Sequence, residues 1–398
     1  MRNAIYPFVA ASAAFCLLIV LVSLYIGIRM GISGRADFRG LYAAGYLVRT
    51  RNASHLFDYA AQRSIENAHV SVEDVALPFN HAPYEALLFA PLSRLPYRSA
   101  YVVVLIGNLC LLALTYTMLQ GYFEPLRQVW SWLPEAMFAC SIPTAVALFQ
   151  SQDSILLFIL ISGAFVLLDR GKEAHAGALV ALSLFKFQYA APIALLFLIW
   201  RRWRFVAAFG VTAGVLALLS FWLIGTEGIS AYVHLLSTTA RLSDAQQYRL
   251  GEYPGSMPNL RGLFYALFHG RTGLTPIATA MASVLLVFFI GLKGRASLPL
   301  AVLVAVLVSY HATLHDMTVT ILPAGVLLTE GITSHRNWKI AAATTVLVSP
   351  LVLFLTGGRY YLFALVILAA TIVGARDYGL TPTKCACGSA EGEAIPTS

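Results

Sequence analysis

Residues 174–200 read AHAGALVALSLFKFQYAAPIALLFLIW, an apolar run that Lys186 and Pro192 interrupt. As a single helix, its roughly 27 residues at 1.5 Å each would be about 40 Å long, enough for one tilted crossing of a bilayer. Basic residues flank the run on both sides, namely Arg170, Lys172, Arg201, Arg202 and Arg204. Because basic loops stay on the cytoplasmic side of a membrane, both ends share that side only if the run enters and returns as two short helices. We therefore predict a helical hairpin that is broken near Lys186.

The chain around this hairpin has the composition of a membrane protein. Of its 398 residues, 59% are hydrophobic and 12% are charged, and the mean hydropathy is +0.73, whereas soluble domains carry about 25% charged residues. Since about 20 apolar residues cross a bilayer as a helix, we expect further spans at residues 5–28, 99–119, 134–149, 154–169, 205–224, 276–292, 297–311, 316–330, 340–356 and 360–375. The predicted fold class is all-α, a single polytopic bundle over residues 1–375 with about 10–12 transmembrane or half-spanning helices.

Three stretches do not fit a full span. Residues 29–82 carry many charged side chains, yet apolar or small residues recur with helical spacing at Phe38, Leu41, Tyr42, Gly45 and Tyr46. This pattern predicts an amphipathic extracytoplasmic helix that lies on the membrane surface after the first span. Residues 84–95 are apolar but short and end before Pro96, which favours a half-span or an interfacial helix. Residues 376–398 have few apolar side chains, so we expect a disordered cytoplasmic tail.

Charge and motif content exclude several classes of function. The formal net charge is +8, but the basic residues lie mostly in short loops and form no stripe interleaved with aromatic residues, so nucleic-acid binding is not expected. The five cysteines show neither a disulfide framework nor zinc-ligand spacing. No phosphate-binding loop or dinucleotide-binding fingerprint occurs in the sequence. We expect neither a metal ion nor an organic cofactor.

The hairpin topology places every return point of the chain on the extracytoplasmic side. Polar residues from distant parts of the sequence are then expected in one layer: Asp37, Asn80, His81, Gln150, Gln152, Asp153, Lys186, Gln188, Tyr189, residues 241–259, His311, His315, Asp316 and Arg359. The ordinary polarity of loops would explain many of them. It explains four of them less well, because they interrupt apolar runs, where ionisable side chains are costly and usually functional. These four are Lys186, His311, His315 and Asp316.

A polar layer at one membrane edge fits two classes of protein, an enzyme that acts on a membrane-borne substrate and a transporter or flippase. Transporters often contain internal repeats and bind their substrates near the bilayer midplane. This chain has no visible repeat, and its polar residues gather toward one face. The long polar stretch after the first span can also roof a catalytic cleft. The enzyme is therefore the favoured interpretation, with the transporter as the alternative.

Short motifs follow one another in a characteristic order over roughly residues 35–325. They are DF at 37–38, YAAG at 42–45, LFDY at 56–59, YEALL at 84–88, PL at 91–92, LP at 95–96, QDS at 152–154, Lys186 with Pro192 before the arginine loop, NLRGL at 259–263, HD at 315–316 and LP at 322–323. In this order of motifs the chain resembles glycosyltransferase family 87, whose members are similar to polyprenyl-phosphate-mannose-dependent mannosyltransferases of the GT-C superfamily.

The resemblance implies a GT-C-type fold and a multi-pass glycosyltransferase of the cell (inner) membrane. The implied reaction transfers a hexose, mannose foremost, from a polyprenyl-phosphate donor to a glycolipid or polysaccharide acceptor. It would take place at the extracytoplasmic face, with inversion, among membrane lipids. The resemblance further implies that Asp37 is the general base and that His315 lies near the donor phosphate.

The chemistry of such a transfer asks for the same kinds of residue. One carboxylate must take the proton of the acceptor hydroxyl, and cationic or hydrogen-bonding groups must stabilise the leaving phosphate. Asp37 suits the first task, although an aspartate at this position can instead cap the helix that begins at Phe38. The candidates for the phosphate are His315, Lys186 and His311.

Two of these candidates have simpler interpretations that remain open. Lys186 can equally well snorkel toward the membrane interface or neutralise Asp153, and Asp316 can serve only to orient the ring of His315. Weaker candidates for contact with the substrate are Tyr42, Tyr84, Gln152, Asp153, Asn259 and Asp316.

Overall fold

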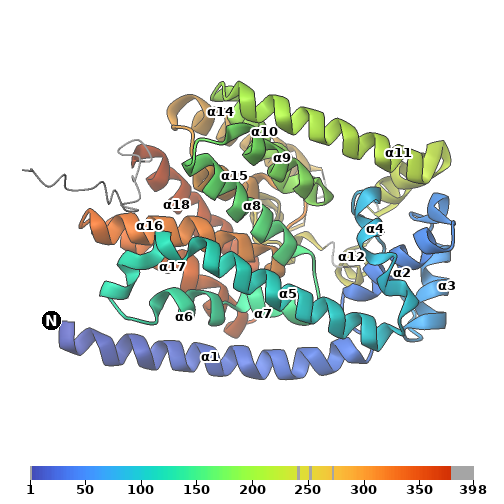
Figure 1. Ribbon diagram of the computed structural model, residues 1–398, viewed down its shortest axis with the longest axis horizontal. Helices are drawn as coiled ribbons and strands as arrows, with labels where there is room; N and C mark the ends of the chain where they lie inside the picture. The colour runs from blue at the N-terminus through green and yellow to red at the C-terminus, as the bar shows by residue number, and fades with distance from the viewer. Residues whose placement is uncertain (1, 240–242, 251–252, 271–272, 378–398) are drawn as a thin grey trace, which may run out of the picture.

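The computed structural model describes residues 2–239, 243–250, 253–270 and 273–377 (Figure 1). Every regular element in these ranges is a helix, so the predicted all-α class is confirmed. The helices are α1 Arg2–Ile32, α2 Phe38–Arg49, α3 Tyr59–His69, α4 Ala86–Phe89, α5 Tyr97–Leu119, α6 Leu133–Ala139, α7 Ile142–Phe149, α8 Ser154–Asp169, α9 Glu173–Leu182, α10 Phe187–Ile199, α11 Trp203–Thr239, α12 Asp244–Arg249, α13 Leu260–Leu267, α14 Leu274–Lys293, α15 Leu298–Val308, α16 Ile321–Thr333, α17 Asn337–Leu355 and α18 Phe363–Asp377. Nearly all of the predicted tail lies outside the described residues.

By length and composition alone, six helical stretches among the described residues could cross a membrane: Val9–Ile32, Tyr97–Gln128, Glu173–Ile199, Trp203–Leu235, Leu274–Lys293 and Asn337–Leu355. Three shorter apolar helices accompany them, which agrees with the expected mixture of full and partial spans. Large apolar side chains such as Trp222 of α11 and Leu292 of α14 are more than 70% exposed. Such outward-facing surfaces are suited to lipid rather than water.

The predicted broken hairpin corresponds to α9 and α10. A 3₁₀ turn at Ser183–Lys186 separates the two helices, and the chain then returns so that Arg202 Nη1 lies 3.0 Å from Glu173 Oε1 at the other end. A straight helix of this length would hold the same two residues about 40 Å apart. Gly177 permits the close return, because a Cβ there would clash with the backbone carbonyl of Phe205. Lys186 consequently lies at the tip of the hairpin.

Two predicted spans are divided in the structure. Residues 134–149 form the two short helices α6 and α7 instead of one span. The break follows from local chemistry, because the Ser141 side chain accepts a hydrogen bond from the Thr144 amide and caps α7, while Pro143 fits only the first turn of a helix. The predicted span 316–330 begins as a 3₁₀ turn, Leu314–Thr320, before α16.

The helix predicted for the membrane surface forms, but it is buried. Nine of the residues of α2 are buried, including the charged Arg39, whose guanidinium pairs with Glu66 of α3. The two charges satisfy each other inside the protein, so α2 needs no polar face toward solvent. Gly45 adds to the close packing, since a Cβ there would meet the Phe89 carbonyl. The predicted half-span 84–95 contains only one helical turn, α4, between 3₁₀ turns.

Helices α1 and α11 run roughly along the longest axis of the molecule in Figure 1, on opposite sides of it. Helices α2, α3, α4 and α12 gather at the end toward which α1 carries the chain, and the outer half of α11 reaches the same end (Figure 1). The 3₁₀ turns at Ser183–Lys186 and Leu314–Thr320 and the start of α8 meet one another in the interior. Three segments that were predicted to share one polar layer, those around Asp153, Lys186 and Asp316, therefore meet in the fold.

Candidate active site

A cavity of about 300 Å³ lies where these elements meet. Its walls include Asp37, His81, Gln152, Lys186, His311 and His315. Five of these six residues were predicted site residues, and His81 was placed in the predicted polar layer without a role. The volume lies at the lower end of the range for small-molecule sites, which is about 300–1,000 Å³. The cavity is therefore large enough for a sugar or a phosphate group.

Asp37 lies between α1 and α2 and presents its carboxylate to the cavity. Its backbone amide donates to Gln150 Oε1 at 2.8 Å, and Gln152 Nε2 donates to Asp37 Oδ2 at 2.8 Å. The side chain makes no capping hydrogen bond to α2, and it remains about one-third exposed. Asp37 therefore does not cap α2 through its side chain. The neutral amide of Gln152 holds the carboxylate and leaves it open to a substrate.

The imidazole of His315 connects Asp37 with the interior of the protein. Nε2 lies 3.7 Å from Asp37 Oδ2 and 2.6 Å from Thr313 Oγ1. Nδ1 lies 2.9 Å from Ser154 Oγ and 3.2 Å from Asp316 Oδ1. His315 is only 7% exposed, so its ring is fixed from both sides and its Nε2 edge faces the cavity. Thr313 Oγ1 and His315 Nε2 form this hydrogen bond at the cavity wall, next to Asp37.

Lys186 is the centre of a buried charge cluster behind His315. Its ammonium group lies 2.6 Å from Asp316 Oδ1, 2.8 Å from Asp153 Oδ1 and 3.2 Å from Ser154 Oγ. The residue is 3% exposed. Two carboxylates thus surround one lysine, the arrangement expected from the neutralising interpretation, and the same lysine also borders the cavity. Asp316 is additionally held by a capping box with Thr313.

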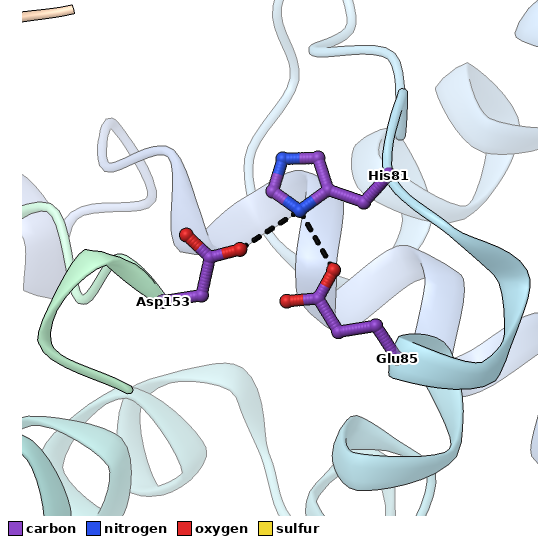
Figure 2. Close-up of side chains that lie close together, drawn as sticks. All are labelled: His81, Glu85 and Asp153. Carbon is purple, nitrogen blue, oxygen red and sulfur yellow. Dashed lines mark hydrogen bonds and ion pairs between the residues drawn. The ribbon is translucent and has the colours of Figure 1, made fainter. Parts of the chain in front are cut away.

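A second cluster adjoins the first through Asp153 (Figure 2). His81 Nδ1 lies 2.9 Å from Asp153 Oδ2 and 2.7 Å from Glu85 Oε2, and Glu85 is fully buried. Burial lowers the pKa of His81, but the larger effect of the two neighbouring carboxylates raises the pKa of the ring to about 10. Burial raises the pKa of Glu85 to about 8 despite the opposing charge of His81. Positive charge is therefore strongly favoured at the point where the three side chains meet.

Three of the weaker candidates lie away from the cavity walls. The Tyr42 hydroxyl donates to the Leu95 carbonyl at 2.8 Å, and the Tyr84 hydroxyl donates to the Leu182 carbonyl at 3.0 Å. Asn259 caps α13 through Gly262 and donates to the Ser309 carbonyl at 2.9 Å. Each contact joins two segments of the bundle, so these residues support the walls without facing the cavity.

Sequence reasoning assigned no role to Glu85 or Ser154, although both adjoin predicted residues. A buried acidic residue four positions after a histidine is a weak signal, because the same spacing occurs in ordinary helix pairs. Ser154 follows the QD pair and bonds His315, Asp316 and Lys186 at once. Neither contact can be read from spacing, since each joins segments that are distant in the sequence.

The chain matches the model of one known family. The family model described as Glycosyltransferase family 87 matches residues 79–315, more than half of the chain. The matched range contains His81, Asp153, Lys186 and His315, while Asp37 lies before it. No curated protein and no solved structure matches the chain. The resemblance found from the ordered motifs is confirmed.

Proposed function

The chain belongs to glycosyltransferase family 87, and from that premise we propose that it transfers a hexose, mannose foremost, from a polyprenyl-phosphate donor to a glycolipid or polysaccharide acceptor. The single observation that carries the proposal is the approach of Asp37 Oδ2 to within 3.7 Å of His315 Nε2 at the cavity wall. The Asp37 carboxylate can accept a proton, and the His315 imidazole can donate a hydrogen bond. A glycosyl transfer needs both functions around one sugar carbon, so the bound sugar would have to enter between these two groups and separate them.

The chemical step proceeds as a single displacement. The acceptor oxygen attacks the anomeric carbon while the bond from that carbon to the phosphate oxygen breaks, and the bonding electrons leave with the polyprenyl phosphate. Asp37 takes the proton from the acceptor hydroxyl, and His315 donates a hydrogen bond to the departing phosphate oxygen. His311, which also borders the cavity, is a further contact for the phosphate. Attack opposite the leaving group inverts the configuration of the sugar.

The orientation follows from the basic loops. Arg170, Lys172 and the arginines at 201, 202 and 204 lie at the base of the hairpin, away from Lys186. If these loops face the cytoplasm, the cavity opens at the extracytoplasmic side of the inner membrane. A lipid-linked donor can reach it there from the bilayer.

A panel of polyprenyl-phosphate sugars, offered to the purified protein with a glycolipid acceptor, tests the proposal. We expect release of polyprenyl phosphate with at least one hexose donor, and formation of an inverted glycoside. The same protein in proteoliposomes serves to examine transport of the donor. Absence of release with every donor, together with measurable uptake or flipping, would support the transporter alternative instead.

His315→Ala should reduce transfer by about 10²- to 10³-fold, the usual effect of removing one donor that stabilises a developing anion. The matched control is His175→Ala, which removes an exposed imidazole at the base of the hairpin. Turnover with saturating donor is the measurement, alongside the thermal unfolding of both variants. Unchanged turnover in a folded His315→Ala protein would reassign this histidine to structure.

A further inference from the structure

His81, Glu85 and Asp153 remain outside the mechanism above, although they converge beside the cavity that it uses (Figure 2). We propose that these three side chains form a binding site for a divalent cation of the Mn²⁺ type. The site departs from the sequence-based expectation that no metal takes part. Cation binding is inferred from the geometry alone, and the role of the cation rests on the proposed function.

The spacing of the ligand atoms fits a cation. One atom from each of the three residues lies within 4.8 Å of the others. Nδ1 of His81 is 2.7 Å from Glu85 Oε2 and 2.9 Å from Asp153 Oδ2. Neighbouring ligands of an octahedral cation with metal–ligand distances of about 2.1 Å lie about 3 Å apart. Small adjustments would therefore place all three atoms around one ion.

One buried oxygen of the cluster has no hydrogen-bond partner among the described residues. A ring nitrogen carries at most one proton, yet two carboxylates approach the same nitrogen of His81. Glu85 Oε1 is buried and has no hydrogen-bond partner among the described residues. A buried oxygen in this state normally has a partner, and an ion or a water is the usual explanation. In Figure 2 both carboxylates point toward the same side of the ring.

The charge of the surrounding region favours the same conclusion. Asp37, Glu85, Asp153 and Asp316 bring four carboxyl groups to this region, and Lys186 is the one lysine among the described residues of the cavity wall. A donor phosphate would add another negative charge beside them. A divalent cation would offset two charges and would leave coordination positions open toward the cavity, which His81 borders.

Lys186 does not occupy the proposed position. Its ammonium group contacts Asp153 Oδ1, whereas His81 approaches Asp153 Oδ2. The lysine and the cation would therefore use different oxygens of the same carboxylate. One imidazole with two carboxylates combines nitrogen and hard oxygen ligands, a set that suits Mn²⁺ or Zn²⁺ better than Ca²⁺, which prefers oxygen alone.

Mn²⁺ binding to the full chain in detergent is the direct test. The purified protein is stripped with a chelator and titrated with Mn²⁺, and free Mn²⁺ is followed by electron paramagnetic resonance. We expect one site per chain, weakened at least about 100-fold in His81→Ala and Glu85→Gln, since even changes next to the ligands cost 10- to 100-fold in affinity. His175→Ala is the control and should retain the site.

The inference fails if the stripped wild-type protein binds neither Mn²⁺ nor Zn²⁺ at one site per chain, or if both folded variants bind like the wild type. Glu85→Gln keeps the shape of the side chain, so it guards against a loss caused by unfolding. The transfer assay separates this inference from the proposed function. If the stripped protein has no cation site but still releases polyprenyl phosphate, only the cation site is rejected. If it has a specific cation site but releases polyprenyl phosphate from no donor, only the proposed reaction is rejected.

Discussion

Asp37→Asn is expected to abolish most sugar transfer while the protein stays folded. Asparagine keeps the size of the side chain and can still accept the hydrogen bond that Gln152 donates, and the backbone contact to Gln150 does not involve the side chain. An amide cannot take a proton at neutral pH, however. Because positioned general-base catalysis contributes typically about 10²- to 10⁴-fold, we expect a loss in that range with little change in donor binding.

The matched control for this variant is Asp58→Asn. Asp58 is also an aspartate just before a helix, but its carboxylate accepts hydrogen bonds from the amides of Ala60 and Ala61 and so caps α3. Asparagine and aspartate cap helices about equally well, so transfer by this variant should be close to that of the wild type. The turnover rate and the donor affinity are the quantities to compare. Wild-type turnover by Asp37→Asn would mean that another group, Asp153 or Asp58, accepts the proton.

The hairpin and the polar layer could be predicted because their signals are local in the sequence. Basic residues at both ends of residues 174–200 predicted that the run returns to the side from which it enters, and Lys186 marked the point of the break. The contact between Glu173 and Arg202 agrees with the predicted return. Ionisable residues in apolar runs likewise identified His315 and Asp316, because a membrane makes such residues costly wherever they occur.

Burial and pairing could not be predicted in the same way. The spacing of apolar residues indicated α2. The burial of Arg39 could not be predicted, because its partner Glu66 comes from another helix. The site shows the same limit. His81 meets Asp153 only because the segment before α5 packs against the start of α8, and no periodicity of a single segment contains that information. Composition defines which groups are present, and tertiary packing decides which of them meet.

Lys186→Met is expected to destabilise the protein strongly. The substitution removes the ammonium group from between Asp153 and Asp316, which are both almost completely buried. Breaking a buried ion pair by removing one partner costs about 3–5 kcal/mol, because the remaining charge has no compensation. Here two carboxylates lose the same partner, so we expect a loss at the upper end of that range, seen as a lower midpoint of thermal or denaturant unfolding in detergent.

Two comparisons decide what this lysine does. Lys172→Met removes an exposed lysine at the base of the hairpin and should leave stability nearly unchanged. Adding Asp316→Asn to Lys186→Met should recover part of the lost stability, because residues in direct contact have non-additive effects and one uncompensated charge is then gone. That recovery is expected only if Lys186 neutralises its carboxylate neighbours. A Lys186→Met protein with wild-type stability but weakened donor binding would instead assign the lysine to the donor phosphate, since a group that mainly binds substrate contributes little to unfolding.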